Sequence, residues 1–368
     1  MTAAIHDCPI HHVDMEEVNS MGNVLEVKNL EIQFKINEKY YSAVKDVDFF
    51  IREGETLGLV GESGCGKSVT SLSIMRLLQD SAKVSGNVMY NGKDLLKLPG
   101  SKMRSIRGNE ISMIFQEPMT SLNPVHRIGR QIGESLMLHK GMSARRARQE
   151  AIELLRKVGI PRADEVVDDY PHQFSGGMRQ RVMIAIAMAC EPKLLIADEP
   201  TTALDVTIQA QILDLMRKLA KENNMAILLI THDLGVVAEM CDRVAVMYAG
   251  RVMEQGPVRE IFRNPQNPYT IGLMNSIPKL EGLRTRLQPI EGNVPSVRNM
   301  PQGCRFTARC PYVMDICREH DPGLLAVAED HISRCWLHAD IGADASKYTD
   351  TAMEERQGVP SHAGEVQQ

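Results

Sequence analysis

Short apolar runs alternate with amphipathic segments through the middle of this chain. Residues 55–60, 193–198 and 226–231 are mostly apolar, as strands buried on both faces of a parallel sheet are. Residues 206–223 have apolar positions at helical spacing and complete a β-α-β unit with the runs on either side. Residues 71–78 repeat this spacing after the first run. The pattern predicts an α/β fold whose parallel sheet is covered on both faces.

Other segments show different patterns. Alternating apolar residues at 24–34 and 43–51 predict strands at the edge of a sheet. Residues 83–90 and 111–115 are further strand candidates. Residues 143–155 form an amphipathic helix that begins at a serine, which is typical of a helical insertion.

The C-terminal third has a loop-rich character. Residues 244–254 predict a β-hairpin. Prolines recur after this hairpin, at positions 257, 265, 268, 278, 289 and 295. They predict a second region with little regular structure.

Composition excludes several classes of function. The chain has 368 residues, enough for two domains, and a net charge of -5, so it lacks the basic surface of a nucleic-acid-binding protein. Its longest apolar run, residues 182–190, is about half the length that a membrane span needs. The N-terminus lacks the basic start and apolar core of a secretory signal. We therefore expect a cytosolic chain that reaches a membrane only through protein partners.

Residues 61–68 match the phosphate loop G-x-x-x-x-G-K-[ST]. A predicted strand precedes the loop and a predicted helix follows it, so backbone N–H groups and the helix N-terminus can surround phosphates. Lys67 is expected to reach the β- and γ-phosphates, and the Ser68 hydroxyl to bind Mg²⁺. The nucleotide-binding residues expected here are Gly61, Glu62, Ser63, Gly64, Cys65, Gly66, Lys67, Ser68 and Val69.

Further polar residues follow the ends of predicted strands. Asp198 and Glu199 would face the phosphate loop, because the carboxyl ends of parallel strands meet at one edge of a sheet. Asp198 can hold Mg²⁺ through its water shell, and Glu199 can orient and polarise the attacking water. Gln116 supplies an amide that can contact both metal and water, and His232 can contact the γ-phosphate.

These motifs resemble the complete ordered motif set of an ABC-transporter ATPase subunit. The set comprises residues 61–68 (Walker A), Gln116 (Q-loop), 174–181 (signature), 194–200 (Walker B with the catalytic Glu199), 203–205 (D-loop) and His232 (H-loop). The resemblance covers about residues 24–265. It implies a P-loop NTPase cassette with a RecA-like core, an antiparallel β subdomain and an α-helical subdomain, which binds ATP and Mg²⁺ and hydrolyses ATP.

The resemblance also implies that each ATP lies between two chains. In the family, ATP bound at the Walker A loop of one chain contacts the signature of another. The residues assigned to this contact are Ser175, Gly176, Gly177 and Asp205. Met178 departs from the commonest signature, which has Gln. Family members stack an aromatic ring on adenine, and of Tyr40 and Tyr41 we favour Tyr41, which directly precedes the resumed strand.

Segments outside the motifs resemble the dipeptide/oligopeptide importers, a subfamily that also includes nickel and glutathione importers. These segments are residues 117–124, 170–173, 201–207 and 264–270. The resemblance implies an ATPase bound at the cytoplasmic face of the membrane to two transmembrane permease subunits. An extracellular or periplasmic peptide-binding protein and a second ATPase subunit, usually a different chain, complete the transporter.

The resemblance suggests four parts of the chain. They are a flexible leader (1–22), an ABC ATPase domain (23–265) with a helical insertion at about 117–180, a C-terminal extension (266–340) and a disordered tail (341–368).

The extension holds four of the eight cysteines, with spacing C-x5-C-x6-C-x17-C. Clustered cysteines in a reducing cytosol suggest metal more than disulfides, and the tight pairs of zinc sites are absent. In the peptide-importer ATPases a matching quartet is linked to a [4Fe-4S] cluster. The resemblance therefore implies such a cluster on Cys304, Cys310, Cys317 and Cys335, with zinc or unligated cysteines as alternatives.

Two other classes share the ABC motifs. A DNA-repair ATPase separates Walker A from the signature by a long coiled coil or another large insertion, and no sustained heptads occur here. A ribosomal translation factor carries two cassettes in one chain, whereas each motif occurs once in this sequence. Both patterns favour the transporter.

Overall fold

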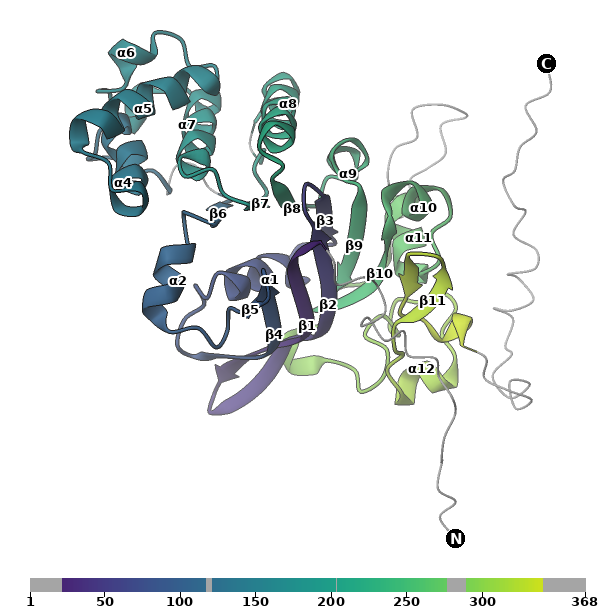
Figure 1. Ribbon diagram of the computed structural model, residues 1–368. Coiled ribbons are helices and arrows are strands. Elements are labelled where there is room, and N and C mark those ends of the chain that lie inside the picture. Colours follow the sequence, from purple (N-terminus) through teal and green to yellow (C-terminus); the bar gives the residue numbers. More distant parts are fainter. Residues whose placement is uncertain (1–21, 117–120, 203, 277–288, 340–368) are drawn as a thin grey trace, which may run out of the picture.

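The computed structural model describes residues 22–116, 121–202, 204–276 and 289–339 (Figure 1). Most of the predicted leader, the predicted tail, residues 117–120 at the start of the helical insertion, and Ala203 of the D-loop lie outside the described residues. The strands of the described part form two sheets.

The first sheet is antiparallel and has the strand order β2-β1-β4-β5. Its strands are β1 (Asn23–Ile36), β2 (Lys39–Arg52), β4 (Ala82–Tyr90) and β5 (Lys93–Asp94). The expectation that residues 24–34 form an edge strand is wrong, because β4 pairs with β1 on the side away from β2.

The second sheet has the strand order β11-β12-β10-β9-β3-β8-β7-β6 in the described part of the chain. Its strands are β3 (Thr56–Val60), β6 (Ile111–Ile114), β7 (Leu194–Asp198), β8 (Ala226–Thr231), β9 (Arg243–Tyr248), β10 (Arg251–Pro257), β11 (Leu325–Ala328) and β12 (His331–Ser333). The run from β9 to β6 is parallel, as the apolar runs predicted, whereas β10, β12 and β11 add antiparallel pairs.

The main sheet is buried on both faces. Leu194 and Ile196 of β7 belong to one hydrophobic core, which also contains the antiparallel sheet, while Leu195 and Ala197 belong to the other. Side chains alternate between faces along a strand, so a run with no polar position must contact apolar partners on both sides. This burial on both faces explains why the sequences of these strands are continuous apolar runs.

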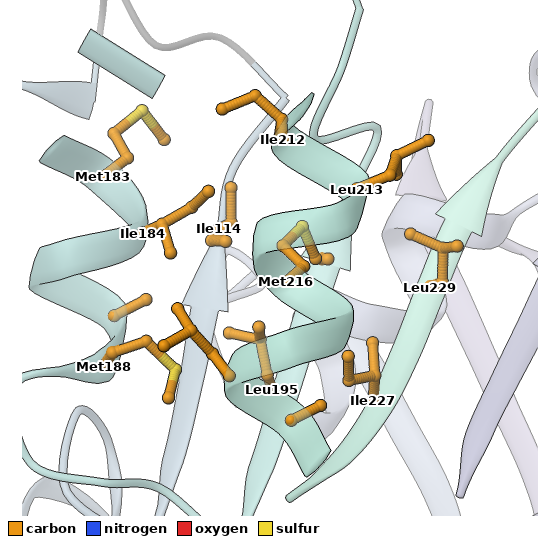
Figure 2. Close-up of a cluster of buried hydrophobic side chains, with 14 of the residues drawn as sticks. Ile114, Met183, Ile184, Met188, Leu195, Ile212, Leu213, Met216, Ile227 and Leu229 are labelled. Carbon is orange, nitrogen blue, oxygen red and sulfur yellow. The ribbon is translucent and has the colours of Figure 1, made fainter. Parts of the chain in front are cut away.

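A group of helices forms the second core against this sheet. These helices are α4 (Ile128–Lys140), α5 (Ala144–Lys157), α6 (Ala163–Val166), α7 (Gly176–Met188) and α8 (Val206–Asn223). The α5 helix starts at the predicted serine, since Ser143 Oγ accepts a hydrogen bond from the Arg146 N–H. Figure 2 shows side chains of α7 and α8, among them Ile184 and Met216, gathered against β6, β7 and β8.

The remaining helices are short. They are α1 (Lys67–Ile74), α2 (Gly100–Ile106), α9 (Leu234–Met240), α10 (Val258–Arg263), α11 (Pro268–Asn275), α12 (Asp315–Glu319) and the 3-10 turns η1 (Pro171–Gln173), η2 (Val297–Asn299) and η3 (Trp336–His338). Among the described residues, none of the helices has the length and apolar character that a membrane crossing requires.

The C-terminal region is joined to the main sheet through a buried polar cluster. β12 pairs with β10, and the fully buried Glu254 of β10 lies 2.7 Å from His331 Nε2 of β12. Glu254 also accepts hydrogen bonds from the backbone N–H groups of Gln266 and Asn267, at 2.6 and 3.0 Å. A buried carboxylate is tolerated only when such donors surround it, so this cluster fixes the start of the C-terminal region against the ATPase core.

The His331→Ala substitution tests this connection. It removes one partner of a buried carboxylate and should lower the free energy of unfolding by about 2–4 kcal/mol, measured by urea denaturation. Glu329→Ala, at an exposed position of the same hairpin, is the control and should have little effect. A loss below about 0.5 kcal/mol in His331→Ala would contradict the structural role of the cluster.

Candidate nucleotide site

The phosphate loop follows β3 and leads directly into α1. The helix begins at Lys67 and ends at Ile74, so the predicted helix at 71–78 was placed too late, because its first turn belongs to the loop motif itself. Gly61 and Gly66 have φ angles of 150° and 105°. A Cβ at Gly61 would lie 2.1 Å from the Met247 carbonyl oxygen, so glycine is required there by the close approach of two backbones.

Lys67 lies folded across its own loop. Its Nζ donates hydrogen bonds to the carbonyl oxygens of Gly61 (2.7 Å) and Glu62 (3.0 Å), and its side chain is buried. An ammonium held against the backbone of the loop is suited to binding phosphate oxygens.

Ser68 and Asp198 form the second element of the site. Ser68 Oγ donates a hydrogen bond to Asp198 Oδ1 at 3.1 Å, which joins the start of α1 to the end of β7. Burial raises the pKa of Asp198, the hydrogen bond from Ser68 opposes this effect, and the neighbouring Glu199 charge adds to it. Adjacent hydroxyl and carboxylate oxygens are the ligands that Mg²⁺ takes from proteins when substrate phosphates supply others.

Glu199 is the centre of a polar network at the same sheet edge. Its carboxylate accepts hydrogen bonds from Gln116 Nε2 at 2.9 Å and Thr202 Oγ1 at 3.0 Å, and lies 3.1 Å from His232 Nδ1. Burial raises its pKa, but hydrogen bonds from His232 and Thr202 outweigh burial and leave the pKa below its ordinary value. Glu199 is therefore ionised at neutral pH and can accept a proton or a hydrogen bond from water.

The backbone at Glu199 adopts an uncommon conformation. Its φ angle is 47°, in the left-handed region, and its N–H donates to the Ile230 carbonyl oxygen at 2.8 Å. Non-glycine residues rarely adopt this conformation without a structural reason, and such strain is frequent at functional sites. Here it turns the carboxylate away from the strand and toward Gln116 and His232.

Two partners of this network had no assigned role in the sequence prediction. Thr202 lies three residues after Glu199, close enough for its hydroxyl to reach back, and this spacing was the available signal. Gln180, inside α7, donates a hydrogen bond to the Pro200 carbonyl oxygen and is buried. It joins the signature helix to the turn that carries Glu199, a contact across 20 residues that no local pattern indicated.

The signature residues lie elsewhere on the molecule. Ser175 caps α7 by accepting a hydrogen bond from the Met178 N–H at 3.3 Å, and Ser175 and Gly176 are exposed. The hydrogen bonds of the described residues include none between this segment and the phosphate loop. Asp205 is likewise exposed and caps α8 through the Ile208 N–H at 3.0 Å. Figure 1 shows α7 grouped with α4 and α5, apart from α1, at whose start the phosphate loop ends.

The register of β1 and β2 separates the two candidate tyrosines. An irregularity between the pairs Ile32–Val44 and Gln33–Ser42 leaves Tyr41 opposite Phe34. Phe34 and Ile32 lie on the same face of the sheet, and Val44 is opposite Ile32, so Tyr41 and Val44 also share that face. This face lies next to the phosphate loop, because a Cβ added at Gly66 would be 3.1 Å from Val44 Cγ2. Tyr40 lies on the opposite face, where Lys83 Nζ is 3.7 Å from its ring centroid.

The four C-terminal cysteines line one cavity. Cys304, Cys310, Cys317 and Cys335 surround it together with Phe306 and Trp336. Burial raises the pKa of the thiols of Cys304, Cys310 and Cys335, to about 11, about 12 and about 12, and raises that of Cys317. The backbone N–H groups of Phe306, Tyr312 and Leu337 lower the pKa of Cys304, Cys310 and Cys335 respectively, but they do not offset burial. Within the described residues no three His, Cys, Asp or Glu side chains converge tightly enough to hold a single metal ion.

Known protein families match both regions of the chain. The family model "ABC transporter" matches residues 44–202, and the model "Oligopeptide/dipeptide transporter, C-terminal region" matches residues 253–317. Among solved structures, a dimer of the ATP-binding cassette MJ0796 bound to ADP and Pi has a TM-score of 0.58 and 29% identity. That match covers 64% of this chain and 99% of the cassette.

Curated relatives match over nearly their whole length. The oligopeptide transport ATP-binding protein AppD of Bacillus subtilis is 54% identical over 328 residues, which cover 89% of this chain and 100% of AppD. The dipeptide transport ATP-binding protein DppD of the same organism is 51% identical, covering 88% and 99%. The oligopeptide transport ATP-binding protein OppD of Salmonella typhimurium is 50% identical, covering 85% and 93%. The chain belongs to the ATP-binding subunits of the oligopeptide and dipeptide ABC transporters.

Proposed function

We propose that this chain hydrolyses ATP to drive the import of oligopeptides or dipeptides through separate transmembrane subunits. The observation that carries the proposal is the meeting of Lys67, Ser68, Asp198 and Glu199 at one edge of the sheet. Support for a peptide substrate comes from relatives named for oligopeptides and dipeptides, whose similarity extends through the C-terminal region. Nickel or glutathione remain the alternative cargoes within the subfamily.

Different residues of the site bind the phosphates, the Mg²⁺ ion and the adenine of ATP in this proposal. Lys67 exchanges the carbonyl oxygens of Gly61 and Glu62 for β- and γ-phosphate oxygens, while the N-terminus of α1 adds its positive dipole end. Ser68 and Asp198 would hold Mg²⁺, which would supply positive charge beside the phosphates. Tyr41 lies on the face of the antiparallel sheet nearest the loop and is suited to stack on adenine.

Hydrolysis requires a water in line with the γ-phosphate. Glu199 orients and polarises this water, and its lowered pKa keeps it ready to accept a hydrogen bond. Gln116 and His232 hold the carboxylate from two sides and contact the water and the γ-phosphate.

A second ATPase chain completes the site in this proposal. The exposed Ser175 and Gly176 present the N-terminus of α7, a phosphate-binding feature that the loop of the same chain does not use. The dimeric cassette structures similar to this chain support such pairing. Co-purification of the intact transporter, with identification of each chain, decides whether the partner is a second copy or a different subunit.

The chain acts at the cytoplasmic face of the membrane in this proposal. It is bound there through two permease subunits and is served indirectly by an extracellular or periplasmic binding protein. The exposed apolar side chains of Val125, in the turn before α4, and Leu138, on α4, support contact with another protein. ATPase stimulation by the binding protein together with the membrane subunits, rather than by DNA or ribosomes, distinguishes this role from the other ABC classes.

Glu199→Gln and Lys67→Ala separate hydrolysis from binding. Glu199→Gln should retain ATP affinity and lower kcat by roughly 10²–10⁴-fold, because only the acceptor of the water proton is lost. Lys67→Ala should weaken ATP binding by roughly tenfold or more, because the charge-assisted bonds to phosphate are lost. Both are measured on the purified transporter by ATP turnover and equilibrium binding. Glu222→Gln, on an exposed face of α8, is the matched control. Turnover near the wild-type rate in Glu199→Gln would remove Glu199 from its role.

Gly176→Asp tests the two-chain site. An aspartate in the first turn of α7 favours the helix, and the nearest atom to an added Cβ is 3.9 Å away, so folding should be unaffected. The carboxylate would repel the γ-phosphate bound by the partner. ATP binding to the loop of the same chain should be unchanged, while hydrolysis at the site that it completes falls about 100-fold. Gly176→Ala is the milder control. A parallel loss of binding to the chain's own loop would contradict the arrangement.

We also propose that the four cysteines of the C-terminal region hold a [4Fe-4S] cluster. The support for this proposal is that all four thiols line one cavity, and four cysteine thiolates are the usual ligands of such a cluster. Backbone N–H groups lower the pKa of Cys304, Cys310 and Cys335, which favours the thiolate form that binds iron. The cluster would cross-link the small region, and redox sensing is the further role it could supply.

Metal analysis tests the cluster directly. Protein purified without oxygen should contain about four irons and four sulfides per chain, with broad visible absorbance. Cys310→Ser should lose most of the iron, whereas Cys190→Ser, at the end of α7 and outside the cavity, should keep it. One zinc per chain without iron would contradict the proposal.

A further inference from the structure

An acidic residue lies within the anion-binding loop, where it opposes the loop's function. Glu62 is the second residue of the phosphate loop, and a carboxylate at this position would repel the negative phosphates of ATP. The structure pairs this carboxylate with a guanidinium. Arg309 Nη1 lies 3.1 and 2.9 Å from the two carboxylate oxygens of Glu62. The cation comes from the C-terminal region, 247 residues further along the chain.

Arg309 is itself rigidly held. Its Nε donates to the Glu291 carbonyl oxygen at 2.9 Å, and its Nη2 donates to the Ile290 carbonyl oxygen at 3.1 Å. The guanidinium carbon lies 5.6 Å from the ring centroid of Tyr248, and only 5% of the Arg309 side chain is exposed. A guanidinium held by these contacts has a defined position, so it can determine where the Glu62 carboxylate lies.

A second contact fixes the backbone of the same residue. The Glu62 N–H donates a hydrogen bond to Tyr269 Oη at 3.0 Å, and Tyr269 is fully buried on α11. The Tyr269 ring packs on Tyr248 and Phe306, with centroid distances of 4.6 and 5.4 Å. The phosphate loop is therefore held at Glu62 by both its side chain and its main chain, and both partners belong to the region beyond the hairpin.

The contacts at Glu62 also affect the position of Lys67, the phosphate-binding lysine. Lys67 Nζ donates to the Gly61 carbonyl oxygen, which belongs to the same planar peptide group as the Glu62 N–H that Tyr269 binds, so the contact with Tyr269 also helps to position the ammonium. The segment that carries Arg309 also borders the cysteine cavity, because Arg309 directly precedes Cys310 and Phe306 lines that cavity. The same short segment thus contacts the cavity and the loop.

We propose that Arg309 is a positioning residue through which the C-terminal region sets the ATP affinity of the phosphate loop in its own chain. It neutralises Glu62 and holds it away from the phosphates. The inference rests on ATP hydrolysis by this chain and is independent of which metal, if any, the cysteines hold.

The test is the dependence of ATPase rate on ATP concentration in the purified transporter. Arg309→Met should raise KM for ATP about tenfold, because the Glu62 charge is no longer neutralised, and should leave kcat within about twofold. Arg309→Lys, which keeps the charge, should restore most of the affinity. Arg318→Met removes an equivalent charge beside Cys317, on the exposed face of α12, and should leave KM unchanged. An unchanged KM in Arg309→Met would overturn the proposal.

A double variant separates charge neutralisation from a structural role. Glu62→Gln removes the carboxylate that Arg309 neutralises, so the pair Glu62→Gln with Arg309→Met should return KM to within about threefold of wild type. This pair leaves no buried charge unpaired, so it remains informative even where Arg309→Met alone folds poorly. A KM that stays about tenfold raised in the double variant would show that Arg309 acts by another route and would overturn the proposal. If the unmodified transporter did not hydrolyse ATP at all, the result would instead contradict the proposed ATPase function.

Discussion

The close approach of the phosphate loop to neighbouring backbones is the constraint on which the rest of the site depends. A Cβ at Gly61 would lie 2.1 Å from the Met247 carbonyl oxygen, and one at Gly250 would lie 1.8 Å from that of Ala43. The Gly250 N–H also donates to the Cys65 carbonyl oxygen at 2.8 Å. These contacts hold the loop against β9 and against the turn at Gly250, which in turn packs on β2, and so fix where α1 begins. A side chain at Gly61 would push the loop away from β9, and one at Gly250 would push the turn away from β2.

The order of the parallel strands then brings the other groups to the loop. β8, β7 and β6 follow β3 across the sheet, and each ends in a residue of the site: His232, Asp198 with Glu199, and Gln116. Since neighbouring parallel strands are about 4.8 Å apart, these side chains converge without long connections. Their hydrogen bonds to Glu199 turn a row of strand ends into one network.

The sequence predicted the parts of this site that depend on local pattern. The helix at 206–223, the buried strands and the motif residues at their ends were all visible in apolar periodicity and in short spacings. The contacts that join segments far apart in the sequence could not be predicted from such local patterns. Pairing of β12 with β10 depends on Glu254 meeting His331 across 77 residues, and Arg309 meets Glu62 across 247. The choice between Tyr40 and Tyr41 needed the strand irregularity near Ala43, which reverses the face that each ring occupies.

The chain presents a phosphate loop and an exposed signature, and we propose that a partner chain completes each of them into an ATP site. The most direct measurement is an experimental structure of the transporter carrying Glu199→Gln, trapped with ATP and Mg²⁺. We expect two ATPase chains head to tail, with Lys67 of this chain and the signature of its partner on the same γ-phosphate. An ATP contacted by both Lys67 and Ser175 of a single chain would contradict it.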